Sequence, residues 1–348
     1  MSAADKLLGL ELKNGWKVTR HLQRGPAATG GMFSQSYIAE KGAAVGFLKA
    51  FDFSPALQPD VDMANEIQKL IACYNHERAI LDHCRGRRLS KVVIALDHGD
   101  VQVPGMGPME GRVFYLIFEM AEGDVRVQMD TSTACDALWC MHALKDITLG
   151  LWQVHKEMIA HQDGKPSNVL AYPGPSFKVA DFGRSSRKGQ PAAHDDFKIA
   201  GDRGYAPPEQ LFGFVHPEFT NRRIGCDLYM LGNLAAFLFS GVNITPLLLS
   251  KLDPQHHPRA WGGTYEQVLP YVRNAFSAVL ADVSPLIDER VRADVLGLVR
   301  EFCDPDLQRR GHPDHLGQST QFSLERYVSR MDLAAKRLSI LMRTGRAA

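Results

Sequence analysis

Three features that often reveal function are missing from this chain: paired cysteines, an excess of one charge, and a long apolar run. Its six cysteines include no CxxC pair, which argues against a zinc site or a disulfide framework and suits a reducing cytosol. The formal net charge is +1, so the sequence gives no reason to expect nucleic acid or an anionic membrane as a partner.

The apolar segments are too short to cross a bilayer. The N-terminus lacks the basic start and apolar core of a signal peptide. The most apolar later stretch, LYMLGNLAAFLFSG at residues 228–241, is interrupted by glycine and asparagine. Since a membrane-spanning helix needs about 20 apolar residues, we interpret this stretch as a buried helix and expect a cytoplasmic protein with no membrane partner.

Length and composition predict a folded protein of two parts. At 348 residues, the chain exceeds the roughly 250–300 residues at which a single hydrophobic core stops growing. Hydrophobic residues make up 45% and charged residues 23%, which is ordinary for a well-packed globular protein. We therefore expect two lobes or domains.

The first part, residues 16–118, has mainly the pattern of strands. Short runs rich in aromatic and β-branched residues are separated by turn signals. These runs are WKVTRHL, FSQSYIAE, AVGFLKAF, KVVIALDHG and RVFYLIFEM.

One helix interrupts these strands, at about residues 62–84. Tyr74, Glu77 and Leu81 are spaced by three and four residues, which places them on one face. A buried charge needs a partner, so a glutamate on this face is unusual. Periodicity alone leaves open that Glu77 merely lies at the edge of the apolar stripe.

Beyond residues 121–124 the pattern becomes helical. The segment CDALWCMHALKDITLGLWQVHKEM predicts a long amphipathic helix. Further helices are expected at 226–240, 264–281 and 285–302. A strand-rich part followed by a larger helical part indicates an α+β fold.

The chemistry is concentrated in the motif HQDGKPSNVL at residues 161–170 and in a DFG shortly after it. Phosphoryl transfer from ATP requires held phosphates, a coordinated metal, compensation of developing charge and an oriented accepting hydroxyl. Asp163 can orient that hydroxyl or accept its proton, and Lys165 can offset charge on the transferred group. Asn168 and Asp181 offer the oxygen ligands that Mg²⁺ prefers.

These motifs resemble those of the protein kinase superfamily. HQDGKPSN is similar to the catalytic loop H-R-D-L-x-x-x-N, with glutamine in place of the arginine, and DFG is similar to the magnesium-binding motif. The D-x-K-P-x-N pattern resembles the serine/threonine-specific members, and the chain as a whole looks bacterial-like. The resemblance extends over about residues 15–315. It implies an ATP-dependent kinase that phosphorylates serine or threonine in a protein substrate of unknown identity, with autophosphorylation as a further option.

The resemblance also implies a two-lobed fold. A small N-terminal lobe, residues 15–121, would contain an antiparallel sheet and the family's helix C, and a larger, mainly helical lobe would follow at 122–315. Residues 1–14 would form an N-terminal extension, and residues 316–348 a basic amphipathic helix or tail. This C-terminal helix is expected either to pack on the large lobe or to dock a partner.

ATP and Mg²⁺, with Mn²⁺ as an alternative metal, are the cofactors that the resemblance implies. Lys49 in GFLK would hold the α- and β-phosphates, and Glu77 would be its ion-pair partner. The other ATP contacts would come from the glycine loop and from the backbone after the fifth strand. These residues are Gly30, Gly31, Glu119 and Ala121.

Five further residues are implied as structural support of the site. His161 would pack behind Phe182 of DFG, and Asp227 would brace the backbone of the catalytic loop. Glu209 lies in a PPE box that resembles the family's APE motif, and it would pair with a buried arginine. The candidates for that arginine are Arg310 and Arg309.

Two departures from the family concern the nucleotide. The glycine loop, RGPAATGGMFSQSY, is irregular, although backbone amides of other residues can still cradle phosphate. Phe47 stands where the family prefers a small residue against the purine. A benzyl group there should narrow the adenine slot, unless Phe47 simply packs within the small lobe.

Two other departures concern the catalytic loop. Gln162 carries no charge and cannot offer the charge-assisted contact to phosphate that the family's arginine provides, so we expect activity without phosphorylation of segment 184–205. Asp202 replaces a threonine of the family. An acid near Asp163 would be repulsive, so we expect Asp202 to form an ion pair with Lys165.

Other interpretations remain open. A pseudokinase would keep the fold with little turnover, which Phe47 and the irregular glycine loop favour, although the catalytic residues are retained. A small-molecule kinase shares the catalytic core but generally lacks the APE-like box followed by an acid equivalent to Asp227. Ser185 and Ser186, directly after DFG, are candidate autophosphorylation sites, with plain solvent exposure as the simpler interpretation.

Overall fold

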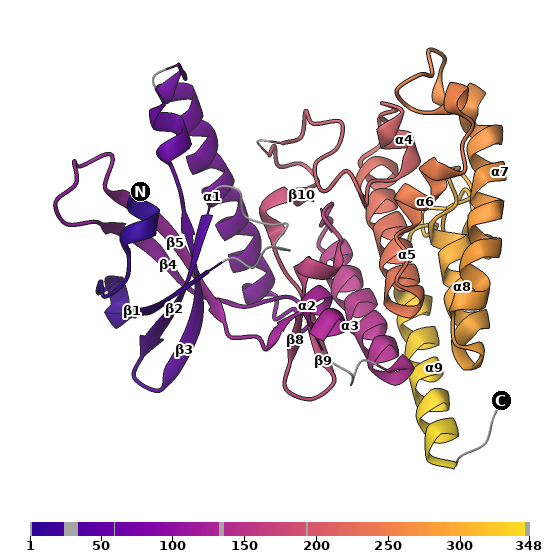
Figure 1. Cartoon of the computed structure of the whole chain (residues 1–348), viewed down its shortest axis with the longest axis horizontal. Coiled ribbons are helices and arrows are strands. Elements are labelled where there is room, and N and C mark those ends of the chain that lie inside the picture. The colour runs from indigo at the N-terminus through magenta and orange to yellow at the C-terminus, as the bar shows by residue number, and fades with distance from the viewer. Residues whose placement is uncertain (1, 24–33, 59, 132–135, 193, 345–348) are drawn as a thin grey trace. The chain divides into compact units, whose positions relative to one another are not determined.

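The chain divides into two compact units, Met1–Glu122 and Gly123–Ala348 (Figure 1). Each unit has its own buried core. The computed structural model describes residues 2–23, 34–58, 60–131, 136–192 and 194–344.

The first unit contains a five-stranded sheet in which all neighbouring strands are antiparallel. The strand order is β1-β2-β3-β5-β4. The strands are β1 (Lys17–Leu22), β2 (Ser34–Lys41), β3 (Ala44–Phe51), β4 (Ala95–Gln102) and β5 (Arg112–Glu119). Strand β4 begins later than the sequence pattern predicts. Just before it, the Ile94 amide donates to the Glu119 carboxylate at 2.8 Å, and the Ile94 carbonyl oxygen accepts from the Glu119 amide at 3.1 Å.

Helix α1 (Met63–Gly86) lies between β3 and β4 in the chain. Its first turn is capped by the carboxylate of Asp62, which accepts a hydrogen bond from the Asn65 amide at 3.2 Å. Glu77 and Leu81 of the predicted face are both buried. The alternative that Glu77 lies at the exposed edge of the stripe is therefore wrong.

The first residues of the chain contribute to the core of this unit. Leu7 and Trp16 are buried in the same cluster as Tyr37 of the sheet. The Tyr37 hydroxyl donates to the carbonyl oxygen of Ala4 at 2.7 Å. The described part of segment 1–14 is therefore packed against the sheet. It contains the short 3₁₀ helix η1 (Ala3–Lys6), and η2 (Lys13–Gly15) overlaps its end.

The second unit is mainly helical. Its helices are α2 (Val125–Thr131), α3 (Ala137–Lys156), α4 (Pro208–Leu211), α5 (Gly225–Ser240), α6 (Ile244–Ser250), α7 (Tyr265–Val283), α8 (Glu289–Phe302) and α9 (Glu325–Thr344). Two small antiparallel sheets have the orders β6-β8-β9 and β10-β7. Their strands are β6 (Gly123–Asp124), β7 (Ile159–Ala160), β8 (Val169–Tyr172), β9 (Ser176–Val179) and β10 (Ser186–Arg187). A small antiparallel sheet unit followed by a larger helical unit is the predicted α+β fold.

Short helical turns lie in or beside the functional motifs of this unit. They are the 3₁₀ helices η4 (Pro166–Asn168) and η5 (Phe182–Arg184) and the π-helical turn η6 (Thr220–Ile224), which leads directly into α5.

Helix α5 is buried on nearly all sides. Leu228, Leu231 and Leu234 are at most 1% exposed, as expected for a helix that is apolar all round. This confirms the buried-helix interpretation of the most apolar stretch. In the described part of the chain no single helix is long and apolar enough to cross a membrane, and one pair of consecutive helices meets that test only jointly, with a bend of 91° between them.

The C-terminal helix α9 packs on α3 and α8, as its position in Figure 1 also shows. Met331 and Leu338 on its apolar stripe are buried. The hydroxyl of Tyr327 donates to Glu301 Oε2 at 2.6 Å. Of the two roles expected for this helix, the structure shows packing.

Candidate active site

Asp163, Lys165 and Asn168 form a hydrogen-bonded cluster in the loop between β7 and β8. The Lys165 ammonium lies 3.1 Å from Asp163 Oδ2. Asn168 Nδ2 donates to both the backbone oxygen and Oδ2 of Asp163, at 2.8 Å each. Pro166 begins the single turn η4, which brings Asn168 back to Asp163. All three side chains of the cluster are buried, so the local sequence pre-organises the catalytic loop.

The DFG motif is held beside this loop by a short antiparallel strand pair. Val169 of β8 pairs with Val179 of β9, and the Ala180 amide donates to the Asn168 carbonyl oxygen at 2.9 Å. Asp181 follows directly, so the two expected metal ligands lie at adjoining ends of paired strands. The φ angle of Asp181 is 62°, a left-handed conformation that is uncommon for a residue other than glycine and is often found at functional sites.

Asp227 on α5 fixes the backbone at the start of the catalytic loop. Its carboxylate accepts hydrogen bonds from the amides of His161 and Gln162, at 2.7 Å each, and the ring nitrogen Nε2 of His155 lies 2.8 Å away. Gln162 has a φ of 64°. The bonds to Asp227 compensate for this unfavourable backbone conformation, and they satisfy a carboxylate that would otherwise be buried at high cost.

His161 and Phe182 lie against each other as the resemblance implies. Their ring centroids are 4.8 Å apart and the rings meet edge to face at 70°. His161 Nε2 also lies 2.8 Å from the Ala180 carbonyl oxygen. The imidazole therefore joins the catalytic loop to the DFG motif by both packing and hydrogen bonding.

Lys165 lies between two carboxylates. In addition to Asp163, it is 3.6 Å from Asp202 Oδ2, so the ion pair predicted from the sequence is present. The backbone amide of Asp202 donates to Asp163 Oδ1 at 2.8 Å. The lysine offsets the repulsion between the two acids, and the amide holds the second oxygen of Asp163.

Gly201 is a residue of this site that the sequence interpretation missed. A Cβ atom at this position would lie 2.2 Å from the Gln162 carbonyl oxygen and 2.8 Å from Asp163 Oδ1. Such distances exclude any side chain, because real Cβ atoms do not approach backbone so closely. The only signal in the sequence was a glycine directly before Asp202.

Glu209 pairs with Arg310 and not with Arg309. The guanidinium of Arg310 donates to the two oxygens of Glu209 at 2.7 and 2.8 Å, and both side chains are buried. Burial alone would lower the pKa of Arg310, but the adjacent Glu209 carboxylate raises this pKa above its ordinary value. Arg309 is mostly exposed and lies 3.9 Å from Asp304.

Ser185 and Ser186 are buried, so the interpretation of these residues as solvent-exposed is wrong. The Ser185 hydroxyl donates to the Phe182 carbonyl oxygen at 2.7 Å, and the buried His194 ring lies 2.8 Å from the Ser185 carbonyl oxygen. The Ser186 hydroxyl donates to Asp195 at 2.8 Å. These serines are structural in this conformation, because each hydroxyl is engaged within the fold.

In the first unit, Lys49 and Glu77 form the expected ion pair. Lys49 Nζ on β3 lies 2.9 and 3.0 Å from the two carboxylate oxygens of Glu77 on α1. Glu77 is only 2% exposed, and the lysine therefore compensates a buried charge. The role of this pair in holding ATP phosphates stays a prediction.

The other residues expected to bind the nucleotide are placed only in part. Gly30 and Gly31 lie outside the described residues. Glu119 ends β5, and its amide donates to the Ile94 carbonyl oxygen at 3.1 Å, so an adenine contact from Glu119 would have to use its own carbonyl oxygen. Ala121 follows β5 and is half-buried.

Phe47 pairs across the sheet with Phe118. The two residues are opposite each other in the β3–β5 register, and their ring centroids are 6.3 Å apart. Phe118 is buried, whereas Phe47 is partly exposed. The contact with Phe118 shows Phe47 packing within the small unit, and the narrowing of an adenine slot stays a prediction.

The donor set fits a magnesium ion that is bound together with a nucleotide. Among the described residues, no group of three or more His, Cys, Asp or Glu side chains is arranged to hold a metal by itself. Asn168 and Asp181 offer two oxygen ligands at adjoining strand ends. Mg²⁺ is commonly held in this way, by one or two protein oxygens together with phosphate oxygens and water.

Comparison with known proteins gives relatives of one type. The chain is 29% identical to CTD kinase subunit alpha of Saccharomyces cerevisiae over 44% of its own length and 29% of that protein. It is 24% identical to mitogen-activated protein kinase 5 of Oryza sativa subsp. indica over 60% of its own length and 55% of that protein. It is 25% identical to the serine/threonine-protein kinase PrkC of Bacillus subtilis over 45% of its own length and 24% of that protein. The matches thus span about a quarter to about half of these relatives.

The family model described as the protein kinase domain matches residues 64–315. This region contains α1 from its second residue, the catalytic loop, the DFG motif and the Glu209–Arg310 pair, and it begins after Lys49. It covers more than half of the chain, and the residues that it spans form the buried cluster around Asp163 described above. The chain belongs to the protein kinase domain family.

Proposed function

We propose that this protein is an ATP-dependent kinase that transfers the γ-phosphoryl group to serine and threonine hydroxyls of protein substrates. One observation carries the proposal: Lys165 and Asn168 both contact the carboxylate of Asp163 in a buried cluster, within a chain of the protein kinase domain family. The relatives also support it, since each of the three is named as a kinase or kinase subunit and one as a serine/threonine-protein kinase.

The geometry around Asp163 supports a role in orienting the accepting hydroxyl. Lys165 and Asn168 hold Oδ2, and the Asp202 amide holds Oδ1. A carboxylate fixed at both oxygens is pre-oriented to accept a hydrogen bond from a substrate hydroxyl and then its proton. When bound, ATP supplies the transferred group and its metal offsets the phosphate charge.

The other residues have roles that follow from their charge and position. The ammonium of Lys165, beside Asp163, would neutralise charge that develops on the transferred group. Asn168 and Asp181 would hold the metal, and Lys49, kept in place by Glu77, would hold the α- and β-phosphates. Specificity for serine and threonine is inferred from the D-x-K-P-x-N pattern, in which the lysine is Lys165.

A pseudokinase is the second candidate, and Phe47 favours it. Its partly exposed ring lies on β3 two residues before Lys49, where it would reduce the space for a purine. A small-molecule kinase is less well supported, because the Glu209–Arg310 pair and Asp227 are both in place. The cytoplasmic location expected from the sequence stays a prediction.

Transfer of radiolabelled phosphate tests the proposal. Wild type with Mg-ATP and a mixed protein substrate should label serine and threonine, and Asp163→Asn should lower labelling by roughly 10³-fold or more, since the group that orients the hydroxyl is lost. Asp314→Asn is the matched control, because this acid is 76% exposed and should keep wild-type activity.

Mapping the labelled residues extends the experiment. Label on serine or threonine of the protein itself would support autophosphorylation, and label on other proteins would indicate substrates. Tight binding of Mg-ATP without transfer would favour the pseudokinase. Labelling of small molecules alone would overturn the assignment of a protein substrate.

A further inference from the structure

Gln162, which stands where the resemblance expects an arginine, has every polar atom of its side chain engaged. Its Nε2 donates to the Ser186 hydroxyl at 2.7 Å and to the Arg184 carbonyl oxygen at 2.9 Å. Its Oε1 accepts a hydrogen bond from Arg223 Nη1. The side-chain amide of Gln162 is buried. It therefore works as a fixed connector between segment 184–205 and Arg223.

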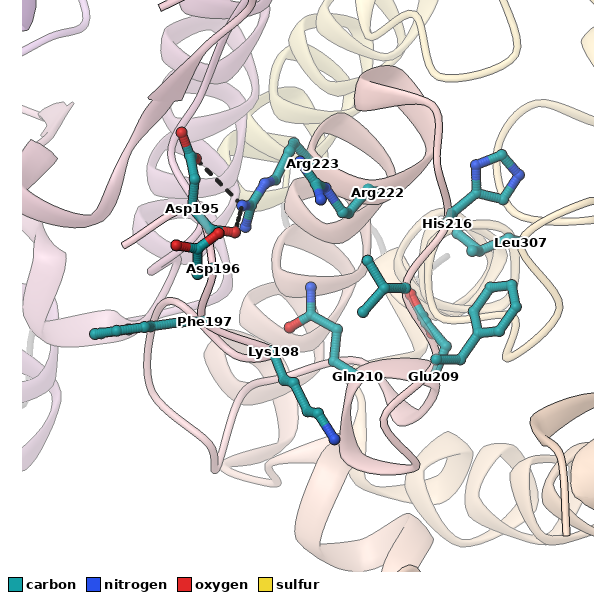
Figure 2. Close-up of a pocket in the computed structure, with 12 residues that line it drawn as sticks. Asp195, Asp196, Phe197, Lys198, Glu209, Gln210, His216, Arg222, Arg223 and Leu307 are labelled. Atoms are coloured by element: carbon teal, nitrogen blue, oxygen red, sulfur yellow. Dashed lines mark hydrogen bonds and ion pairs between the residues drawn. The ribbon is translucent and has the colours of Figure 1, made fainter. Parts of the chain in front are cut away.

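Arg223 brings a positive charge to this connector from another part of the chain. It lies in η6, directly before α5, and its side chain is 2% exposed. Nη2 donates to the carbonyl oxygen of Asp195 at 2.9 Å and to its Oδ1 at 3.2 Å. Figure 2 shows these two contacts as dashed lines. Burial and the neighbouring Arg222 lower the pKa of Arg223, while Asp195 acts in the opposite direction.

Asp195 supplies the negative charge, and it too is fixed by several partners. Oδ1 accepts from the Ser186 hydroxyl at 2.8 Å, and Oδ2 accepts from the Ala192 amide at 2.7 Å. Burial raises the pKa of Asp195, but the Ala192 and Ser186 hydrogen bonds and the charge of Arg223 outweigh burial, so the pKa lies below its ordinary value. Asp195 is therefore charged at neutral pH.

The series of contacts from Asp195 through Arg223 to Gln162 leads to the residue next to the catalytic aspartate, Asp163. Gln162 precedes Asp163 in the sequence, and its carbonyl oxygen faces Gly201 at a distance that excludes a side chain. The next residue, Asp202, donates from its amide to Asp163. Segment 184–205 thus contacts the catalytic loop directly at two places, through Arg184 and Ser186 near its start and through residues 201–202 near its end. Asp195, near its middle, reaches Gln162 through Arg223.

We propose that Asp195 and Arg223 are positioning residues of the kinase. The carboxylate of Asp195 binds Arg223, and Arg223 binds Gln162 of the catalytic loop. These contacts keep segment 184–205 on the catalytic loop without a phosphate. The inference rests on the proposed function and deepens it. A carboxylate carries one negative charge, which matches the guanidinium of Arg223 that contacts it. A phosphate on Ser186 would add about 1.5–2 negative charges beside this acid and would be repulsive.

The surroundings show why the charge of Asp195 is needed. Both Arg222 and Arg223 line a cavity of about 230 Å³ together with Asp195 (Figure 2). Among the described residues, Nε of each of these two arginines is buried without a hydrogen-bond partner. Removing the acid would therefore leave two neighbouring guanidinium groups with less compensation, and the segment would lose its contact with Arg223.

A comparison of two adjacent acids tests the proposal. Asp195→Asn should lower kcat by roughly 10- to 100-fold, the size of effect that a small misplacement of catalytic groups produces, with little change in KM for ATP. Asp195→Glu should recover part of the loss. Asp196→Asn removes the same charge one residue away, from an exposed side chain, and should behave as wild type.

Hydrogen–deuterium exchange supplies a readout that does not depend on turnover. Exchange in segment 184–205 should increase in Asp195→Asn and Arg223→Met but not in Asp196→Asn, while exchange in α5 stays close to wild type. If the wild type transferred no phosphate, this exchange pattern would still be measurable, so failure of the proposed function and failure of the positioning role are distinguishable. Equal kcat and equal exchange in the two asparagine variants would overturn the proposal.

A swap of the connector tests the link through Gln162. Gln162→Arg alone should be strongly impaired, because it places a second guanidinium against Arg223, and Arg223→Gln alone should resemble Asp195→Asn. The double variant again has one amide and one guanidinium in contact and should recover at least part of the activity of either single variant. Non-recovery, or a requirement of the wild type for phosphate on segment 184–205, would contradict the proposed arrangement.

Discussion

Lys165 shows how a single residue can determine the charge balance of the site. It is the cation between Asp163 and Asp202, at 3.1 and 3.6 Å. Without it, two carboxylates would face each other in a mostly buried position. Asp202 therefore does not interfere with Asp163, and its amide contributes directly by holding Asp163 Oδ1.

Position 201 requires glycine, because the catalytic loop leaves no room for a side chain there. We expect Gly201→Ala to lower kcat by about 100-fold, because the new methyl group would displace the carbonyl of Gln162 or the carboxylate of Asp163. Steady-state phosphate transfer measures the loss. Gly262→Ala is the control, since a Cβ there meets nothing within 4 Å. Equal rates for the two variants would mean that segment 184–205 can move away from the loop without consequence.

At Phe47 the size of a side chain bears on nucleotide binding. Phe47→Ala should lower KM for ATP by roughly tenfold, because it opens space beside Lys49 for a purine. Val45→Ala changes an exposed residue on the same face of β3 and should leave KM unchanged. A rise in KM for Phe47→Ala would instead show that the ring supports the small unit or the nucleotide.

At the scale of elements, α5 and α9 have different tasks. Helix α5 is buried and presents Asp227 to the catalytic loop, so the core of the second unit and the site share one helix. Helix α9 lies at the surface of α3 and α8. Its apolar stripe is covered by this packing, and the docking of a partner stays a prediction.

Substitutions on α9 measure that packing. Met331→Ala removes a fully buried side chain and should lower the free energy of unfolding by about 2–5 kcal/mol. Leu333→Ala, at a residue of the same helix that is 69% exposed, should change it by less than about 0.5 kcal/mol. Urea denaturation followed by circular dichroism provides both values. Similar values for the two variants would indicate that α9 is not held against α3 and α8 in solution.

At the scale of the whole molecule, each unit prepares its own part of the proposed reaction. The first unit holds Lys49 against Glu77, and the second holds Asp163, Lys165 and Asn168 in one cluster. Each set is hydrogen-bonded within its own unit, so neither depends on substrate for its internal arrangement. The proposed transfer requires both sets.

Removal of the metal tests this dependence at the molecular scale. Addition of EDTA should abolish phosphate transfer, and excess Mg²⁺ or Mn²⁺ should restore it, because Asn168 and Asp181 are too few to hold a metal without nucleotide. Asp181→Asn should need a higher Mg²⁺ concentration for half-maximal rate, whereas the exposed-acid control Asp314→Asn should not. Undiminished transfer in EDTA would exclude a metal-dependent kinase.

The sequence by itself determined the order of motifs, the α+β division and the residue types of the catalytic loop. These features are local. Apolar and polar residues alternate over the few residues of a strand, and a buried helix is apolar all round. The turn at Pro166 returns Asn168 to Asp163. For the same reason, the buried helix at 228–241 was predictable from composition alone.

Only the tertiary structure decided which distant residues meet. Periodicity could not tell whether Glu77 was buried, and spacing could not choose between Arg309 and Arg310, because a side chain's partner depends on how elements pack. The contact of Gln162 with Arg223 joins residues 61 positions apart, and the requirement for glycine at 201 exists only because another loop passes so close to it. Long-range packing and charge pairing are properties of the folded chain, which no short stretch of sequence contains.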